Sequence, residues 1–379
     1  MKEKSVCSQE PESNLPGAPG IPGSNSNGLR TSPIYARFLM NSPAITSSSA
    51  TLATKVQPVA RFAWLTLAYN IVVILWGAYV RATGSGAGCG NHWPLCNTEI
   101  LPGSAQAQTV IEIIHRITSG MALVMVFALL VWCWRRTSKG DWPRYSAALA
   151  LILLLNEALL GALLVVFDHV AEDRSTARAL FLSLHFGNTL LLLASLSLTA
   201  QWLSNGNGRF RVTGKPRQLA AIGLGLLAVM SIGITGVLAA LGDTVFPHES
   251  LRSSLVQDFS SNSPVLLRLR LLHPLAAVIG ALYVLWVILK SSGKRIHSSW
   301  TLPVLTSTLV VQGSLGALNV MLLAPQWLQI VHLFVADLFW ILLVIASAEL
   351  MLERVDFELV FRRPLMVRES DSCLKFQRL

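Results

Sequence analysis

The chain has 379 residues, of which 53% are hydrophobic and only 13% are charged, and its mean hydropathy is +0.54. This composition excludes an ordinary soluble domain and indicates a polytopic membrane protein. The formal net charge is +10, but the basic residues lie at the ends of apolar segments and form no single patch. We therefore expect a membrane protein that binds no nucleic acid.

The N-terminal segment, residues 1–58, is rich in Ser, Pro, Gly and Asn and contains no long apolar run. It is predicted to be a disordered tail. A secretory signal peptide is not expected, because no apolar segment follows the early lysines. The stretch "LRTSPIYARFLMNSPAITSSSATLATK" is similar to a mitochondrial transit peptide, although acidic residues precede it.

Eight apolar stretches are each long enough to cross a ~30 Å hydrocarbon core, which takes about 20 helical residues. They predict an all-α, polytopic fold of eight transmembrane helices. The predicted spans lie near residues 60–80, 110–134, 145–167, 179–203, 219–241, 271–289, 300–323 and 329–350.

The distribution of Lys and Arg predicts the orientation of these helices. Basic residues gather in the loops after the second, fourth and sixth spans, within 135–144, 209–217 and 290–295, and are scarcer in the opposite loops. By the positive-inside rule, the basic loops and both termini are predicted to be cytoplasmic. Residues 353–379 then form a cytoplasmic C-terminal tail.

Two of the five cysteines, Cys89 and Cys96, lie in the first outer loop, within "GCGNHWPLCN". Flanking Gly and Pro allow this loop to turn back, and it is predicted to face an oxidising compartment, so the pair is a candidate disulfide. Two free thiols, or half of a metal site with His92, are the alternatives.

The apolar spans repeat. "IIHRITSGMALVMVFALLV" in the second span resembles "LLHPLAAVIGALYVLWVIL" in the sixth, and "NEALLGAL" in the third resembles "VQGSLGAL" in the seventh. Four spans return the chain to its starting side. The repeat therefore predicts two pseudo-symmetric four-helix bundles in parallel orientation, residues 59–208 and 209–352.

Four histidines, His115, His185, His273 and His332, fall in the first turns of the four even-numbered spans. Because these spans run in the same direction, the four side chains should lie at a similar depth, near the outer face. Two facing imidazoles suit the axial positions of a haem iron, and bundle cores often hold such sites. The alternative for any single histidine is a hydrogen bond to a neighbouring helix.

The two halves differ around their first histidine. Glu112 precedes His115 by three residues on the same helix face, whereas Arg270 stands three residues before His273. The first half thus has a candidate acid or base beside its histidine. The alternative is that Glu112 only forms an ion pair with Arg116, at positions i and i+4.

The segments "YVRATGSGAGCGNHWPLCN", "IEIIHR", "STARALFLSLHFGNTLLLLA" and "LLHPLAAVIG", with the histidine of the eighth span, strongly resemble the haem A synthase family. The resemblance covers roughly residues 60 to 350. It implies oxidation of the C8 methyl group of haem O to a formyl group, which gives haem A for cytochrome oxidase.

The resemblance also implies roles for single residues. His115 and His185 would hold the iron of the substrate, haem O, and His273 and His332 the iron of a haem b cofactor. Glu112 would be catalytic, and Cys89 and Cys96 would form a disulfide bond. The arginines near the outer boundary are candidate partners of the haem propionates, and these are Arg81, Arg116, Arg268 and Arg270.

The implied partners are the lipid bilayer, a haem O synthase and an electron acceptor, with a homo-oligomer also considered. The bacterial inner membrane is the expected location, and the mitochondrial inner membrane is the alternative. A dihaem electron carrier linked to quinone would explain four histidines without needing Glu112, and a haem transporter would explain the repeat.

Two departures from the family pattern concern the second half. Residues 242–269 contain no cysteine pair, which some relatives carry there. Glu157 in the third span has Gln312 as its counterpart in the seventh. The sequence leaves open whether Glu157 belongs to a proton path or only donates and accepts hydrogen bonds.

Overall fold

The structure, a computed structural model, describes residues 43–96, 106–171, 173–206, 208–247, 250–258, 260, 264–291 and 301–355. The chain divides into two compact units, residues 1–49 and 50–379. The boundary falls inside the first described helix, and the description below concerns the second unit.

The described elements are almost all helical. In chain order they are helix α2 (Pro43–Ala82), the 3-10 turn η1 (Ser85–Ala87), α3 (Ala107–Arg136), α4 (Trp142–Val166), α5 (Thr176–Ser204), strand β1 (Arg209–Val212), α6 (Pro216–Val245), α7 (Leu251–Asp258), α8 (Val265–Ser291), α9 (Thr301–Met321), α10 (Gln326–Met351) and strand β2 (Leu352–Val355).

Within the described residues, eight helices are long and apolar enough to cross a membrane. They confirm the eight predicted spans, with ends that differ from the predicted ones by a few residues. The first, for example, runs from Gln57 to Ala82 and the last from Gln326 to Met351. The chain is thus an all-α, polytopic membrane protein.

The prediction of a disordered tail was wrong for residues 43–58, because α2 begins at Pro43. Proline suits the first turn of a helix, where its missing N–H has no intrahelical acceptor to lose. Residues 1–42 lie outside the described residues, so the rest of the predicted tail is not tested. The C-terminal tail also lies outside them after residue 355.

Local sequence accounts for several helix ends. Pro143 and Pro216 lie in the first turns of α4 and α6, where proline is tolerated. Ser175 caps α5, since its side chain accepts a hydrogen bond from the backbone N–H of Arg178 at 3.1 Å.

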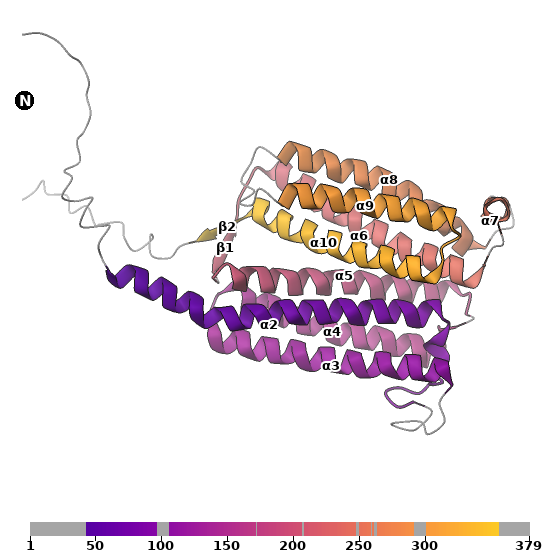
Figure 1. Cartoon of the computed structure of the whole chain (residues 1–379), viewed down its shortest axis with the longest axis horizontal. Coiled ribbons are helices and arrows are strands. Elements are labelled where there is room, and N and C mark those ends of the chain that lie inside the picture. The colour runs from indigo at the N-terminus through magenta and orange to yellow at the C-terminus, as the bar shows by residue number, and fades with distance from the viewer. Residues whose placement is uncertain are drawn as a thin grey trace, which may run out of the picture. The chain divides into compact units, whose positions relative to one another are not determined.

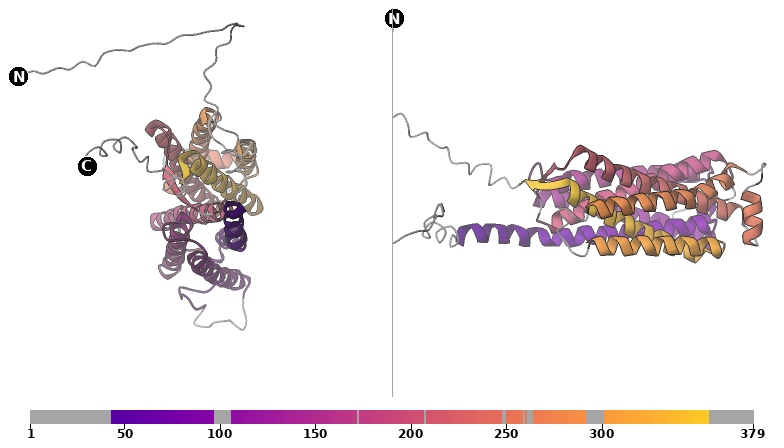
Figure 2. Two further views of the ribbon diagram at one scale, coloured as in Figure 1. Left: turned by 90° about the vertical axis from the view of Figure 1, so that its left-hand side faces the viewer. Right: turned by 90° about the horizontal axis from the view of Figure 1, so that it is seen from above.

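The spans form two groups, which Figures 1 and 2 show side by side. We call α2–α5 the first half and α6 with α8–α10 the second half. In the first half α4 packs against α3 and α5, and in the second α6 packs against α8, and α9 against α8 and α10. The halves meet mainly where α5 contacts α6 and α10.

Buried side chains form the contact between α5 and α10. Trp340 of α10 is buried and donates from Nε1 to the carbonyl oxygen of Leu190 in α5 at 2.7 Å. Leu193 and Leu196 of α5 are fully buried in the same apolar cluster. Apolar side chains of other helices, such as Val72 of α2 and Ile152 of α4, are exposed, as expected for surfaces that face lipid.

A short antiparallel pair of strands lies away from the histidines. β1, which precedes α6, pairs with β2, which follows α10, in the register Arg209 with Val355 and Val212 with Leu352. Arg211 and Glu353 add an exposed ion pair at 3.2 Å. The pair ties the start of the second half to its end (Figure 1).

Candidate functional site

The four predicted haem ligands each lie within the first three turns of a membrane span. His115 is in α3, His185 in α5, His273 in α8 and His332 in α10. The loop with the two cysteines lies beside the start of α3. We call this end of the bundle the disulfide end.

In the first half, each histidine packs against a glycine of the preceding span. A Cβ atom on Gly77 of α2 would lie 2.9 Å from Cε1 of His115. A Cβ atom on Gly161 of α4 would lie 3.6 Å from Cε1 of His185. The missing side chains thus leave room for the two imidazoles between helices.

The second half repeats this arrangement. A Cβ atom on Gly236 of α6 would lie 3.0 Å from Cε1 of His273, and one on Gly316 of α9 would lie 3.2 Å from Cε1 of His332. Contacts this short are tighter than nearly all real Cβ contacts, so a larger residue would displace the ring. Gly77, Gly236 and Gly316 are therefore positioning residues for their histidines, whereas Gly161 is only in ordinary contact with His185.

Sequence analysis missed these glycines, although a signal exists. Each lies near the disulfide end of its span, in the short repeats "WGAY", "LGAL", "TGVL" and "LGAL". The match between the third and seventh spans already contained two of them. The sequence pattern did not show that each glycine packs against the histidine of the following span.

Each half carries two of the four histidines. His115 and His185 lie in the first turns of α3 and α5, and His273 and His332 lie in the first turns of α8 and α10. Within the described residues, no three His, Cys, Asp or Glu side chains form a cluster that could hold a metal ion. The pattern is thus one of histidine pairs.

The imidazole nitrogens have different surroundings. Nδ1 of His273 lies 3.2 Å from the carbonyl oxygen of Ile232 and 3.3 Å from Oγ1 of Thr235. Nδ1 is buried and has no hydrogen-bond partner among the described residues in the other three histidines, His115, His185 and His332. A buried nitrogen without a partner is costly unless something else binds the ring.

We predict that Gly236→Ala displaces His273, because the added Cβ would lie 3.0 Å from Cε1 of the ring, which must then shift. Overpacking of this kind costs about 1–3 kcal/mol. The matched control is Gly223→Ala in the same helix, where a Cβ would meet nothing within 4 Å, and where alanine favours the helix by about 1 kcal/mol. The midpoint of thermal unfolding should fall for the first variant only. Equal unfolding midpoints for the two variants would contradict the close packing of Gly236 against His273.

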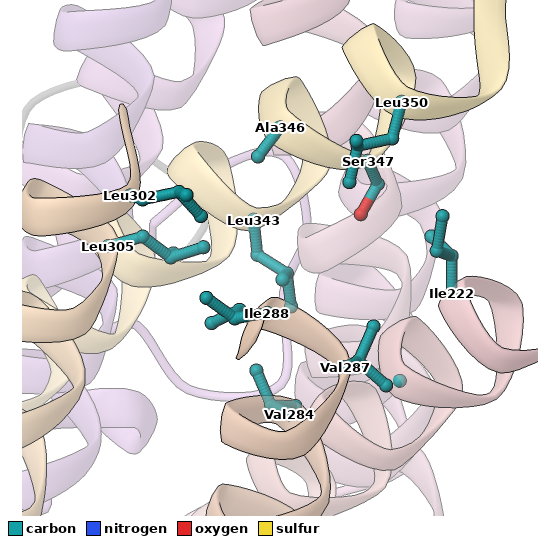
Figure 3. A pocket seen from close by; sticks show the side chains of 11 residues that line it. Ile222, Val284, Val287, Ile288, Leu302, Leu305, Leu343, Ala346, Ser347 and Leu350 are labelled. Atoms are coloured by element: carbon teal, nitrogen blue, oxygen red, sulfur yellow. The ribbon is translucent and has the colours of Figure 1, made fainter. Parts of the chain in front are cut away.

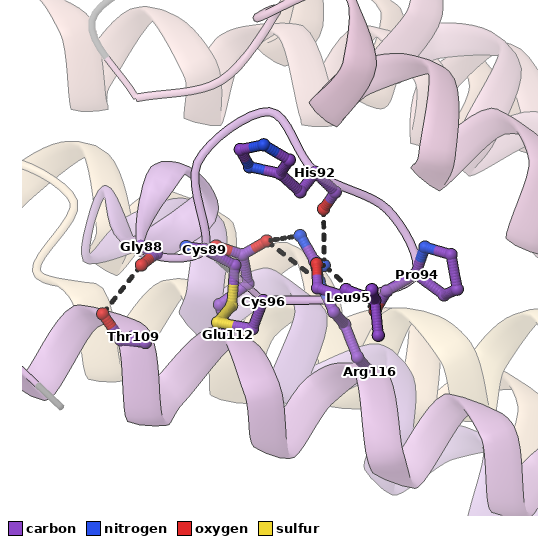
Figure 4. Close-up of a disulfide and its surroundings, with 9 residues drawn as sticks. All are labelled: Gly88, Cys89, His92, Pro94, Leu95, Cys96, Thr109, Glu112 and Arg116. Atoms are coloured by element: carbon purple, nitrogen blue, oxygen red, sulfur yellow. Dashed lines mark hydrogen bonds and ion pairs between the residues drawn. A yellow bond between two sulfur atoms is a disulfide. The ribbon is translucent and has the colours of Figure 1, made fainter. Parts of the chain in front are cut away.

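Glu112 is held by the loop that carries the disulfide (Figure 4). Its side chain is buried, and its Oε2 accepts a hydrogen bond from the backbone N–H of Cys89 at 2.8 Å. Its Oε1 accepts from Nε of Arg116 at 3.1 Å and also from Nη2. The ion pair considered from the sequence is therefore present, and both carboxylate oxygens are engaged.

Arg116 extends this contact to the rest of the loop. Its Nη1 donates to the carbonyl oxygens of His92 at 2.8 Å, Leu95 at 2.7 Å and Pro94 at 3.3 Å. Five donors in a rigid fork make arginine suited to several acceptors at once. Glu112 and Arg116 together fix the loop on α3.

The loop itself confirms the predicted disulfide, since Cys89 and Cys96 are bonded and buried. Gly88 lies directly against α3, and a Cβ there would lie 2.5 Å from the backbone carbonyl carbon of Gln108. Oγ1 of Thr109 donates to the carbonyl oxygen of Gly88 at 2.7 Å. Only glycine allows this close approach.

Arg270, the counterpart of Glu112 in the second half, also binds the segment that precedes its helix. Nη1 of Arg270 lies 3.0 Å from Oδ1 of Asp243, and Nη2 contacts Asp258 and donates to Oγ of Ser254 at 2.9 Å. These contacts hold α7 against α8. In both halves this position anchors a loop.

The other predicted propionate partners have mixed surroundings. Arg81 donates to the carbonyl oxygen of Ala240 at 2.8 Å, to Thr244 at 2.9 Å and to Gln329 at 3.0 Å. Arg268 is exposed. Arg81, like Arg116 and Arg270, is therefore bound by groups of the protein itself.

The loop between α4 and α5 is organised by Asp173. Burial raises the pKa of this carboxyl, but hydrogen bonds from Ser175 and His169 outweigh burial and hold the pKa below its ordinary value. Stability from this carboxylate is present above its unfolded pKa and is lost as the pH falls through the lower folded pKa.

Residues 60–344, about three quarters of the chain, match the sequence model of a family described as "Cytochrome oxidase assembly protein". The chain belongs to the cytochrome oxidase assembly protein family. This membership covers all four histidines, the disulfide loop and Glu112.

The relatives that resemble this chain are named for two different activities. A protein of Thermus thermophilus named "Protoheme IX farnesyltransferase" is 43% identical over 288 residues, which are 75% of this chain and 47% of that protein. "Heme A synthase" of Bacillus licheniformis is 35% identical over 158 residues, 41% of this chain and 49% of that protein. "Heme A synthase" of Bacillus mycoides is 38% identical over 128 residues, 34% and 39% of the two chains. The chain spans about half the length of these relatives or less.

One apolar pocket of this family member lies at the end of the second half away from the histidines (Figure 3). Side chains of α6, α8, α9 and α10 line it, among them Ile222, Val284, Ile288, Leu305 and Leu343. His273 and His332 do not contribute to it. We therefore do not assign the pocket to the histidine site.

The structure also identifies one residue that the sequence analysis missed. Asp337 of α10 is fully buried, and neither carboxylate oxygen has a hydrogen-bond partner among the described residues. An acidic residue inside "FVADLFWILLV" was the available signal. Ionisable groups within membrane spans are costly to bury, so Asp337, like the four histidines, is a candidate functional residue.

Proposed function

We propose that the chain is a haem A synthase, which oxidises the C8 methyl group of haem O to the formyl group of haem A. The observation that carries the proposal is a pair of histidines in each half, with every imidazole seated against a glycine. Membership of a cytochrome oxidase assembly family and the relatives named "Heme A synthase" support it.

The residues fit two haem groups. His115, His185 and His332 each have a buried Nδ1 atom without a partner, and each ring packs against a glycine, which suits imidazoles that bind a group outside the protein chain. In this proposal His115 and His185 hold haem O as substrate. His273 and His332 hold haem b, and the contact of Nδ1 of His273 with the carbonyl of Ile232 leaves Nε2 for the iron.

Oxidation of a methyl group through an alcohol to an aldehyde, with water as the proposed source of the oxygen atom, releases equal numbers of electrons and protons in steps. A haem b in the second half would supply a relay for the electrons. Glu112 is the proposed proton acceptor. Its carboxylate accepts hydrogen bonds from Cys89 and Arg116. In this proposal the disulfide loop therefore holds the catalytic group in place.

Orientation and location follow from the same proposal. We propose that the disulfide end faces the outside and that both termini are cytoplasmic, as the basic loops predict. The bacterial inner membrane is the proposed location, with the mitochondrial inner membrane as the alternative. A haem O synthase would supply the substrate, and an electron acceptor would receive the electrons.

A second candidate function is transfer of a farnesyl group to protohaem. The relative in Thermus thermophilus named for this activity favours it. This chain matches only 47% of that protein, so the activity can reside in the part that is not matched. The histidine pairs favour haem binding under either function.

The test is to express the chain in a host that makes haem O but no haem A, then extract and separate the haems. We expect haem A and its alcohol intermediate in cells with the wild-type chain, and neither in cells with His115→Ala and His185→Ala at a matched protein level. Recovery of haem b alone would favour a dihaem electron carrier. Absence of any bound haem would favour a transporter. Conversion of protohaem and a farnesyl donor to haem O by the purified chain would favour the second candidate.

A further inference from the structure

The histidines of α5 and α10 each face a polar side chain from the preceding span, and the two side chains differ in charge. Oε1 of Glu157 in α4 lies 3.4 Å from Nδ1 of His185, which is an ion-pair distance without a hydrogen bond between the two atoms. Nε2 of Gln312 in α9 lies 3.3 Å from Nε2 of His332. Each half thus has a polar residue beside one ligand, but only the first half has a carboxylate.

The two residues occupy equivalent places. Glu157 precedes Gly161 by four residues, and Gln312 precedes Gly316 by four, so each lies one helical turn from the glycine that seats the imidazole. The backbone positions therefore match, although Glu157 lies against Nδ1 of its histidine and Gln312 lies against Nε2.

Glu157 is held in place by α5. Oγ1 of Thr189 donates to its Oε1, and Nδ2 of Asn188 donates to its Oε2. Nδ2 of Asn156 in turn donates to Oδ1 of Asn188 at 2.9 Å. Since His185, Asn188 and Thr189 lie on one face of α5, the helix that carries the histidine also orients the carboxylate.

We propose that Glu157 is a positioning residue for His185, and that its carboxylate makes this imidazole a stronger electron donor to a bound iron than any ligand of the second half. A carboxylate beside Nδ1 favours the tautomer with the proton on that nitrogen and leaves Nε2 for the metal. This inference rests on the proposed function, because it assigns His185 to the substrate haem.

The contrast with the other ligands supports the assignment. Nδ1 of His273 faces a backbone carbonyl, and His332 faces a neutral amide. Greater electron donation from an axial ligand stabilises the oxidised iron and lowers its reduction potential. The inference therefore assigns the iron of the first half a lower potential than it would have beside an amide.

The test exchanges the two residues in the haem-loaded full chain and follows both haems in a potentiometric titration. Glu157→Gln gives the first half the residue of the second and should raise the midpoint of one redox component. Gln312→Glu should lower the midpoint of the other. We expect each shift to change the ratio of reduced to oxidised haem about tenfold at a fixed potential, ~59 mV for a one-electron couple.

Glu157→Asp is the conservative control, and it should restore much of the wild-type midpoint and the wild-type electron paramagnetic resonance signals. Full haem content with both midpoints unchanged in Glu157→Gln would overturn the inference, as would equal shifts of both components. If Glu157→Gln binds no haem, Gln312→Glu decides alone, and an unchanged second midpoint then rejects the inference.

These outcomes separate this inference from the proposed function. A wild-type chain that binds haem in both halves but yields no haem A would reject the function, and the exchange would still measure the influence of Glu157. A chain that makes haem A but shows no change of potential in either variant would reject the inference alone.

Discussion

Replacement of His273 by alanine is expected to remove most of the low-spin haem b from the purified protein. The imidazole is one of two predicted axial ligands in the second half, and no other histidine of the described chain lies in its cradle against Gly236. Loss of one ligand exposes the iron to weaker donors, which lowers its affinity and changes its spin state. The measurement is the absorbance spectrum of reduced protein, normalised to protein content.

The control is His92→Ala, since the side chain of His92 is exposed in the disulfide loop. Insertion into the membrane should be unchanged for both variants, because neither alters the apolar length of a span. A His273→Ala protein with the full low-spin spectrum would remove His273 from the ligand set and leave it as a helix-packing residue.

Glu112→Gln is expected to reduce the formation of haem A about a hundredfold or more, the usual contribution of a positioned acid or base. The amide oxygen can still accept from the backbone N–H of Cys89, so the loop should stay on α3. What is lost is the charge and the capacity to accept a proton. The measurement is the ratio of haem A and its alcohol intermediate to haem O in cells with matched protein levels.

Arg116→Lys is the matched variant for the structural alternative. It keeps a cation beside Glu112 but loses the fork that binds the carbonyls of His92, Pro94 and Leu95. This variant should increase the access of a reductant to the disulfide while most conversion remains. Wild-type conversion by Glu112→Gln, or an equal loss in the two variants, would show that Glu112 serves only to anchor the loop.

Arg270 bears on whether Glu112 is catalytic or only anchors the loop. It occupies the place of Glu112 in the repeat and anchors α7 through Asp243 and Asp258. A loop anchor at this position is thus common to both halves, whereas a carboxylate is particular to the first. Catalysis by Glu112 would be a role added to an anchoring role that the structure already displays.

The sequence by itself determined the eight spans, the positions of the four histidines and the cysteine pair. These features depend on local properties, namely apolar length, the helical repeat and a separation of seven residues within one loop. The helical conformation of residues 43–58 was missed because Ser and Thr obscured a helix that begins at a proline.

Only the tertiary structure decided which groups meet between spans. The pairing of Gly77 with His115 and the contact of Glu157 with His185 join residues on different helices, and the rotation of each helix about its axis selects them. The direction of the Glu112 carboxylate, toward Cys89 and Arg116, depended on how the loop folds over α3. Periodicity places a residue on a helix face, but packing between helices determines what that face contacts.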